Sequence, residues 1–246
     1  MNSSRRGWLV AALGTGAVSA LGVGSAGALA GPQGKPKAQG DKPKEQGAST
    51  PIGDEDVWPD EDLMREHGVL NRILLVYDEA IRRIRAHEAV PLEQVRGAAG
   101  IIRRFVEGYH EKLEEEHLFP RFEKAGKLTD LVGVLRAQHE AGRRVTAAIL
   151  DVASRGASAT DASALADQLG QFVRMYRPHE AREDTVLFPG FREIVTRQEF
   201  ERLGEEFEGR EDEVLGEHGF ERVVEEVAGI EKALGIYELS TFTPKI

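Results

Sequence analysis

Two segments of the chain carry histidine and glutamate at the same spacing. Residues 110–120 read HEKLEEEHLFP and return 69 residues later as HEAREDTVLFP at residues 179–189, with six positions identical. A histidine and a glutamate four residues apart lie roughly 40° apart around a helix and about 6 Å along it, so both can reach one point beside the axis. Two such helices facing each other would bring two imidazoles and two carboxylates together. This is the chemistry of a metal site, and the paired carboxylates suit two ions that share them.

Core packing explains only part of this repeat. Duplicated helical hairpins also repeat their core residues, which accounts for Leu118, Phe119, Leu187 and Phe188. It accounts poorly for the paired histidines and glutamates, because a buried carboxylate is unfavourable unless it is paired or bound to a metal. Metal binding is therefore the stronger interpretation.

The elements that must position these residues are helices. From Pro59 onward apolar residues recur at spacings of three and four, and no period-two strand pattern occurs in the sequence, so an all-α protein is predicted. The expected helices cover residues 60–87, 91–124, 129–154, 161–194, a fifth that opens at Thr196, and 211–234. Pro120 and Pro189 follow the two Leu-Phe pairs and are expected to kink or end the second and fourth helices.

The first 56 residues differ from the rest in composition. The pair Arg5-Arg6 precedes an apolar run rich in glycine and alanine, and Ala28-Leu29-Ala30 fits a small-x-small cleavage site. This segment resembles a twin-arginine signal, which directs proteins to a route that exports them already folded around a cofactor. The alternative is that the segment is an uncleaved membrane anchor. Residues 31–56 have almost no apolar side chains, which predicts a flexible linker. The mature protein is expected in the periplasm or outside the cell, free of the membrane.

Charge and cysteine content exclude several classes of protein. The formal net charge is −10, and an acidic surface repels nucleic acid and anionic lipid, so neither is an expected partner. The chain has no cysteine, which excludes disulfides, thiolate zinc sites and iron–sulfur clusters. Histidine and carboxylate remain as the strong metal ligands.

Each motif helix is preceded by a helix that carries one further histidine. His67 lies 43 residues before His110, and His139 lies 40 residues before His179. The chain is therefore two copies of one unit, a helix with a histidine followed by a helix with His-x-x-x-Glu. Antiparallel pairs of this kind form four-helix bundles whose inward side chains can build a metal core.

These residues resemble the hemerythrin-like family, the HHE cation-binding domain, over about residues 60–190. The resemblance implies an up-down four-helix bundle of the hemerythrin type at residues 57–195 and two non-haem iron ions joined by an oxo or hydroxo group. The helices predicted after residue 195 make residues 196–246 an extra C-terminal extension. The implied ligands are His67, His110, Glu114, His139, His179 and Glu183, with Glu114 and Glu183 bridging. Imidazole and carboxylate with open positions suit iron, whereas zinc usually prefers a single four-coordinate site.

One position departs from the family pattern. Oxygen-carrying hemerythrins supply a second histidine from the third helix, four residues from the first, whereas here Leu135 and Arg143 flank His139 at that distance. Glu111 could supply the missing ligand, and water is an equal alternative. The loss of the fifth histidine argues against a simple reversible oxygen carrier.

The sequence thus predicts an exported di-iron protein that binds oxygen or a related small molecule such as nitric oxide or peroxide. An enzyme that reduces nitric oxide or peroxide, or a protein that binds or stores iron without turnover, would use the same ligands. A helical interaction module with a vestigial site is disfavoured, because both copies keep histidine and glutamate. The sequence does not decide whether the protein is an enzyme, nor its oligomeric state.

The remaining histidines and two tyrosines receive structural interpretations. His117 is expected in the core or along an access channel, His87 at the surface, and His218 in a surface or packing role. Tyr109 and Tyr176 lie near the ligands in sequence and are expected to pack in the core or to donate hydrogen bonds to the site.

Overall fold

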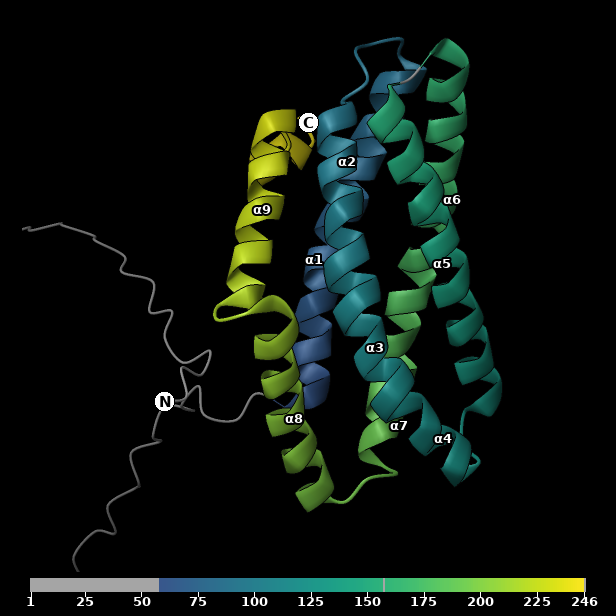
Figure 1. The fold of residues 1–246 in the computed structure, drawn as a ribbon, viewed down its shortest axis with the longest axis vertical. Coiled ribbons are helices and arrows are strands. Elements are labelled where there is room, and N and C mark those ends of the chain that lie inside the picture. Colours follow the sequence, from purple (N-terminus) through teal and green to yellow (C-terminus); the bar gives the residue numbers. More distant parts are fainter. Residues whose placement is uncertain (1–57, 157, 246) are drawn as a thin grey trace, which may run out of the picture. The chain divides into compact units, whose positions relative to one another are not determined.

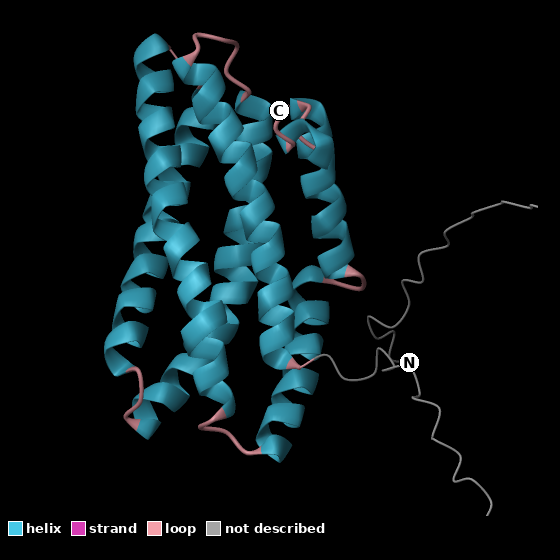
Figure 2. Ribbon diagram, turned by 180° about the vertical axis from the view of Figure 1, so that it is seen from behind, coloured by secondary structure: helices cyan, strands magenta, loops and turns pink. Residues whose placement is uncertain are grey.

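The computed structural model describes residues 58–156 and 158–245, and within them every regular element is a helix (Figures 1 and 2). The prediction of an all-α protein is confirmed for this part of the chain. The export signal and the linker predicted for residues 1–56 lie outside the described residues. Among the helices that are described, none combines the length and the apolar character needed to cross a membrane.

Four long helical runs make up the first two thirds of the described chain. They are α1 (Pro59–Arg85); a second run of α2 (Leu92–Ile101), η1 (Ile102–His110), α3 (Glu111–Leu113), η2 (Glu114–Leu118) and α4 (Phe119–Ala125); α5 (Thr129–Arg155); and a fourth run of α6 (Ala159–Arg182), η3 (Glu183–Leu187) and α7 (Phe188–Arg192). The segments η1, η2 and η3 are π-helical. The first four predicted helices are confirmed, and their ends are displaced by no more than two residues.

These runs lie side by side, and each contacts two others (Figure 1). Helix α1 packs against α2 and α6, and α5 packs against the same two helices. Large apolar side chains such as Ile73, Phe105 and Phe172 fill the space between them and are fully buried. Full burial of a side chain of this size contributes about 1.5–3 kcal/mol. The apolar periodicity of the sequence is thus what holds the helices together.

The two motif prolines do not end their helices, contrary to one form of the prediction. Pro120 and Pro189 stand in the first turn of α4 and α7, and these helices continue to Ala125 and Arg192. A proline is tolerated in the first turn, where its missing N–H is not needed. The irregularity lies just before the prolines, in the π segments η2 and η3. Gly126, with a φ of 63°, ends the second run.

The start of the C-terminal helices at Thr196 and their end at Leu234 are as predicted, but the boundary between the two helices is not. Thr196 caps α8 (Arg197–Leu215), and its side chain accepts a hydrogen bond from the Glu199 N–H. The sixth helix was predicted to start at Glu211, but that residue lies within α8, and α9 runs over Gly219–Leu234. Gly216 and His218 adopt positive φ in the turn between the two helices. A short 3₁₀ helix, η4 (Leu239–Phe242), follows.

Helices α8 and α9 cover one side of the four long runs. Helix α9 packs on α1 and α2, and α8 packs on α1 and η1. Arg72 on α1 holds the buried Glu231 of α9 with two hydrogen bonds, Nε to Oε1 at 3.0 Å and Nη2 to Oε2 at 2.5 Å. A bidentate pair of this kind adds geometric specificity as well as energy. The extension is therefore an integral part of the folded unit.

Candidate metal centre

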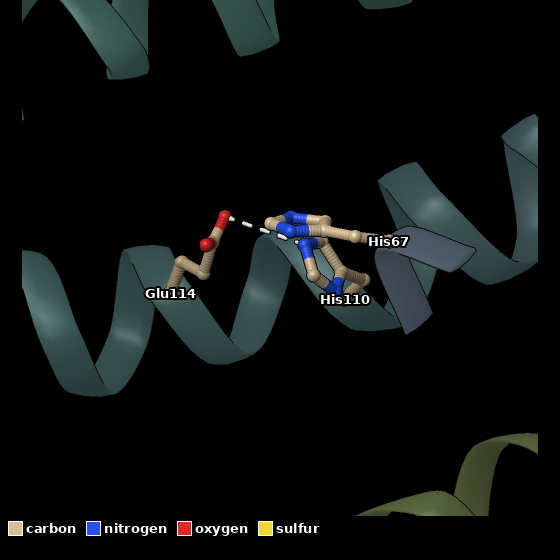
Figure 3. A group of neighbouring side chains, drawn as sticks. All are labelled: His67, His110 and Glu114. Carbon is tan, nitrogen blue, oxygen red and sulfur yellow. Dashed lines mark ion pairs between the residues drawn. The ribbon is translucent and has the colours of Figure 1, made fainter. Parts of the chain in front are cut away.

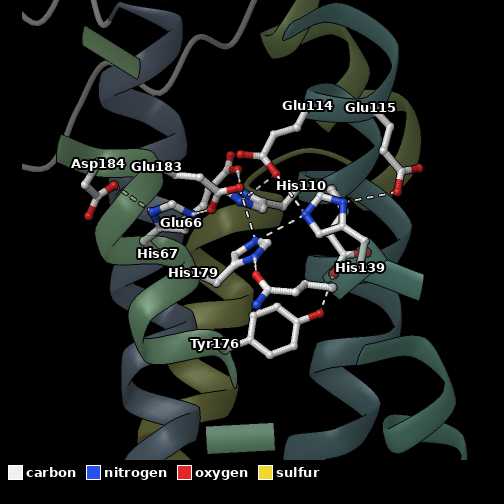
Figure 4. Close-up of polar contacts among 12 residues, drawn as sticks. Glu66, His67, His110, Glu114, Glu115, His139, Tyr176, His179, Glu183 and Asp184 are labelled. Carbon is white, nitrogen blue, oxygen red and sulfur yellow. Dashed lines mark hydrogen bonds and ion pairs between the residues drawn. The ribbon is translucent and has the colours of Figure 1, made fainter. Parts of the chain in front are cut away.

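The six predicted ligands meet in the interior of the protein. The histidines come from four different runs, and the two glutamates each open a π segment. The exposed fraction of each of these residues is between 0% and 4%. They form two sets whose potential ligand atoms lie within 4.8 Å of one another: the His67 group (His67, His110 and Glu114) and the His139 group (His139, His179 and Glu183). Figure 3 shows the His67 group, and Figure 4 shows both groups together.

Each glutamate also touches a histidine of the other group. Glu114 Oε2 lies 3.8 Å from His110 Nε2 and 3.4 Å from His139 Nε2. Glu183 lies 3.1 Å from His179 Nε2 through Oε1 and 3.4 Å from His67 Nε2 through Oε2. Donor atoms that bind one ion at about 2 Å are roughly 3–3.5 Å apart. The two carboxylates are therefore placed as bridges between two cation positions would be.

All four imidazoles turn the same nitrogen to the centre, because the other nitrogen is held from outside. The Nδ1 contacts are His67 with Asp184 Oδ1 at 2.7 Å, His110 with Glu66 Oε2 at 2.8 Å, His139 with Glu115 Oε1 at 3.1 Å, and His179 with Gln138 Oε1 at 2.9 Å. Carboxylate and amide oxygens accept hydrogen bonds, so each Nδ1 carries the proton. Each Nε2 is then the nitrogen that faces inward, where its unprotonated form can bind a metal.

The carboxylates of Glu114 and Glu183 have no hydrogen bond of their own. Glu114 and Glu183 are completely buried, and neither oxygen of either side chain has a hydrogen-bond partner. Removing a charge from water costs several kcal/mol unless the surroundings compensate for it. Burial, and then the neighbouring charge of Glu183, raises the pKa of Glu114 well above its usual range. Although burial opposes it, His179 and His67 lower the pKa of Glu183. A pair of buried carboxylates without hydrogen bonds, among four imidazoles, fits metal cations well.

Burial and the neighbouring carboxylates also shift the pKa values of the histidines. Burial by itself lowers the pKa of His67, but the hydrogen bond to Asp184 and the close carboxylate of Glu183 outweigh it and raise that pKa to about 10. Burial lowers the pKa of His139 to about 4, although Glu115 opposes the shift. The surroundings of His67 thus favour positive charge strongly.

The π segments explain how the motif reaches the centre. His110 is the last residue of η1, Glu114 is the first of η2, and Glu183 is the first of η3. A π-helix bonds residue i to i+5, so its turn is wider than an α turn, and such segments occur frequently at functional sites. In both copies the widened turn starts at the glutamate and runs up to the Leu-Phe-Pro segment. The α-helical spacing predicted the convergence but not this local geometry.

Glu111, the predicted substitute for the fifth histidine, is engaged on both oxygens. Its Oε1 accepts a hydrogen bond from the Tyr176 hydroxyl at 2.7 Å, and its Oε2 accepts one from Arg143 Nη2 at 2.7 Å. Arg143 also donates to Glu115 Oε1 at 2.6 Å. Glu111, Glu115 and His139 nevertheless offer atoms within 4.8 Å of one another. The assignment of Glu111 as a metal ligand remains a prediction.

The Tyr176 hydroxyl is accommodated by a glycine on the facing helix. A Cβ atom at Gly142 of α5 would collide with the Tyr176 hydroxyl and ring. Gly142→Ala is therefore expected to lower the free energy of unfolding by about 1–3 kcal/mol, because Tyr176 must move and Glu111 loses a donor. Urea denaturation would measure the change.

Gly133→Ala is the matched control on the same helix. Gly133 is exposed, and a Cβ there would meet nothing within 4 Å. Alanine at this position should stabilise the helix by about 0.5–1 kcal/mol. Equal changes in the two variants would show that the contact between Gly142 and Tyr176 has no special role.

The other histidines lie away from the centre. His117 is half-buried and faces α8, with Nδ1 3.8 Å from Glu206 Oε1 and its ring edge-on to Phe207. It is a packing residue beneath α8, which agrees with the structural interpretation from the sequence. His87 and His218 are exposed, as predicted, and neither belongs to a potential metal-binding set within the described residues.

Sequence reasoning missed the four residues that hold the imidazoles from outside. All four are sequence neighbours of a ligand, yet each supports a histidine on another helix. Glu66 precedes His67, Gln138 precedes His139, Glu115 follows Glu114, and Asp184 follows Glu183. Polar residues directly beside predicted ligands were the available signal.

The described geometry agrees with what comparison of the sequence shows. The model of the family "Hemerythrin HHE cation binding domain" matches residues 59–191. The chain belongs to this hemerythrin family. The matched residues include all six predicted ligands, and α8 and α9 lie beyond them. Membership supports cation binding at the two histidine and glutamate groups.

Two relatives of this hemerythrin-family chain come from mycobacteria. They are "Uncharacterized protein Rv1995" of Mycobacterium tuberculosis and "Uncharacterized protein Mb2018" of Mycobacterium bovis. Each is 51% identical over 199 residues, which cover 80% of this chain and 78% of the relative. No solved structure matches the chain.

Proposed function

We propose that this chain is an exported non-haem di-iron protein that binds oxygen or a related small molecule such as nitric oxide or peroxide. In this proposal the four long runs are the up-down four-helix bundle of the hemerythrin type. The observation that carries the proposal is the cross-contact of the carboxylates, since Glu114 and Glu183 each touch histidines of both groups.

The two groups of predicted ligands would each hold one ion. His67 and His110 would hold one ion, His139 and His179 the other, and Glu114 and Glu183 would bridge them. Mixed imidazole and carboxylate ligands with open positions suit iron. When bound, the iron pair supplies electron exchange and an open coordination position for a small ligand.

The chain's own residues orient the imidazoles and exclude water. The Nδ1 contacts fix which nitrogen of each histidine faces the metal. The phenylalanine of each motif stacks on a histidine of the other group: Phe119 on His139 and Phe188 on His67, each with ring centroids 5.5 Å apart. These buried rings keep the centre dry, which strengthens every electrostatic interaction inside it. The repeated Leu-Phe pair thus packs the core and shields the site.

An enzyme that reduces nitric oxide or peroxide is the second candidate. It is favoured by the residue that stands where a fifth histidine would be, since Arg143 pairs with Glu111 and Glu115 instead of offering a ligand nitrogen. The ion held by His139 and His179 would then have fewer protein ligands than the corresponding ion of an oxygen-carrying hemerythrin, and more room for a reactant.

Metal analysis of protein purified after native export, together with an absorption spectrum, tests the proposal. Two irons per chain with oxo-bridge bands are expected, and one zinc per chain would overturn it. Repeated additions of oxygen, nitric oxide or peroxide to the reduced protein then separate the two candidates. A spectrum that is restored when the gas is removed indicates a carrier, and continuous consumption indicates an enzyme.

Export is a separate part of the proposal. Replacing Arg5 and Arg6 together with lysine should keep the protein in the cytoplasm, because the two residues keep their charge but lose the guanidinium pair. Immunoblots of cell fractions would measure the distribution. Lys35→Arg with Lys37→Arg is the control and should leave export unchanged. Normal export of the Arg5 and Arg6 variant would contradict the twin-arginine route.

A further inference from the structure

The residues that hold the imidazoles from outside differ between the two groups. In the His67 group both histidines donate to carboxylates, His67 to Asp184 and His110 to Glu66. In the His139 group the partners are one carboxylate, Glu115 on His139, and one uncharged amide, Gln138 on His179. The two groups are therefore unequal in charge just outside the predicted ligands.

Positively charged side chains increase this inequality. Glu115 is bound by Lys112 Nζ at 2.6 Å and by Arg143 Nη2 at 2.6 Å, so its negative charge is balanced. Within residues 58–156 and 158–245, neither Glu66 nor Asp184 forms an ion pair with a lysine or an arginine. The side chain of Glu66 is only 1% exposed, so water screens its charge little.

We infer that the two metal positions are inequivalent, and that the His67 group is the tighter site and fills first. This inference rests on the proposed two-ion function. A carboxylate that accepts the Nδ1–H makes the imidazole more basic and a stronger metal ligand, and loss of such a partner typically weakens metal binding 10–100-fold. Two such partners with unbalanced charge act on the His67 group. The His139 group has one, and its charge is balanced.

The filling order can be read with Zn²⁺ alone on metal-free protein labelled with ¹⁵N at histidine. At one equivalent of Zn²⁺, the NMR signals of His67 and His110 are expected to shift, and those of His139 and His179 should follow at the second equivalent. Uptake of two equivalents with all four histidines shifting together would overturn the inference and leave the two-ion proposal intact. Saturation at a single equivalent would instead overturn the two-ion proposal.

Two substitutions of outer partners are expected to change the order in a defined way. Asp184→Asn should weaken the first binding event about 10–100-fold, and Gln138→Glu should tighten the second by a similar factor. The variant with both changes should bind Zn²⁺ first at His139 and His179. Calorimetric titration would give the two constants. A gain in affinity from Gln138→Glu is not what structural damage would produce.

Glu116→Gln is the matched control. Glu116 is an exposed carboxylate in η2 that lies next to Glu115 in the chain but contacts no imidazole of the centre. Both constants should be unchanged in this variant. Far-UV circular dichroism of each metal-free variant establishes that it folds, and Gln138→Glu alone still tests the inference if Asp184→Asn does not. Unchanged filling order in Gln138→Glu and in the double variant would overturn it.

Discussion

Replacing either Glu114 or Glu183 with alanine should leave the chain with fewer than one bound iron, where the unmodified chain is expected to hold two. Each glutamate contacts two histidines, one in each group, so its removal takes a ligand from both metal positions at once. The loss also leaves cations facing neutral imidazoles, which cannot balance their charge in a buried site. Metal analysis and the absorption spectrum would measure the effect.

Glu116→Ala is the control for this prediction. Glu116 lies in the same π segment as Glu114 and is exposed. Its loss should change neither the metal content nor the spectrum. Two irons per chain in Glu114→Ala or in Glu183→Ala would contradict the bridging assignment.

The sequence was sufficient to predict which histidines and glutamates meet in the interior, because the motif is duplicated. A single His-x-x-x-Glu on a helix is common, whereas two copies, each with a further histidine 40 or 43 residues upstream, require a common centre. Helical periodicity then predicted four runs whose ends agree with the structure to within two residues. Both signals are local in the chain, and local patterns are what periodicity reports.

The local geometry of the ligands could not be predicted in the same way. Whether a turn is α or π depends on how the side chains before and after it pack against neighbouring helices. The residue types in η2 do not distinguish it from an α-helical turn. The residues that accept the Nδ1–H bonds of the histidines can also be identified only from the folded structure, since Glu66 supports a histidine on another run. Arg143 was visible as a departure from the family pattern, but its pairing with Glu111 and Glu115 depends on the approach of α5 to the second run.

Glu114→Leu should have opposite effects on stability with and without metal. In the metal-free protein Glu114 is fully buried without a hydrogen bond, and a leucine of similar volume removes that penalty. The metal-free variant is therefore expected to be more stable than the unmodified chain by about 1–3 kcal/mol. With metal the order reverses. Metal at 100 to 1,000 times its dissociation constant adds about 3–4 kcal/mol to the unmodified chain and little to the variant.

The pH dependence of the free energy of unfolding would identify Glu114 as the source of the greater stability of the metal-free variant. Burial raises the pKa of Glu114 in the folded protein, so the folded state holds this proton more tightly than the unfolded state does. The group therefore destabilises the metal-free protein increasingly as pH rises above the unfolded pKa of about 4.3. The stability advantage of Glu114→Leu should thus be small near pH 4 and larger at pH 7, measured by urea denaturation in the presence of a chelator. A variant that is less stable than the unmodified chain both with and without metal would mean that Glu114 stabilises the core by packing and is not held there for a cation.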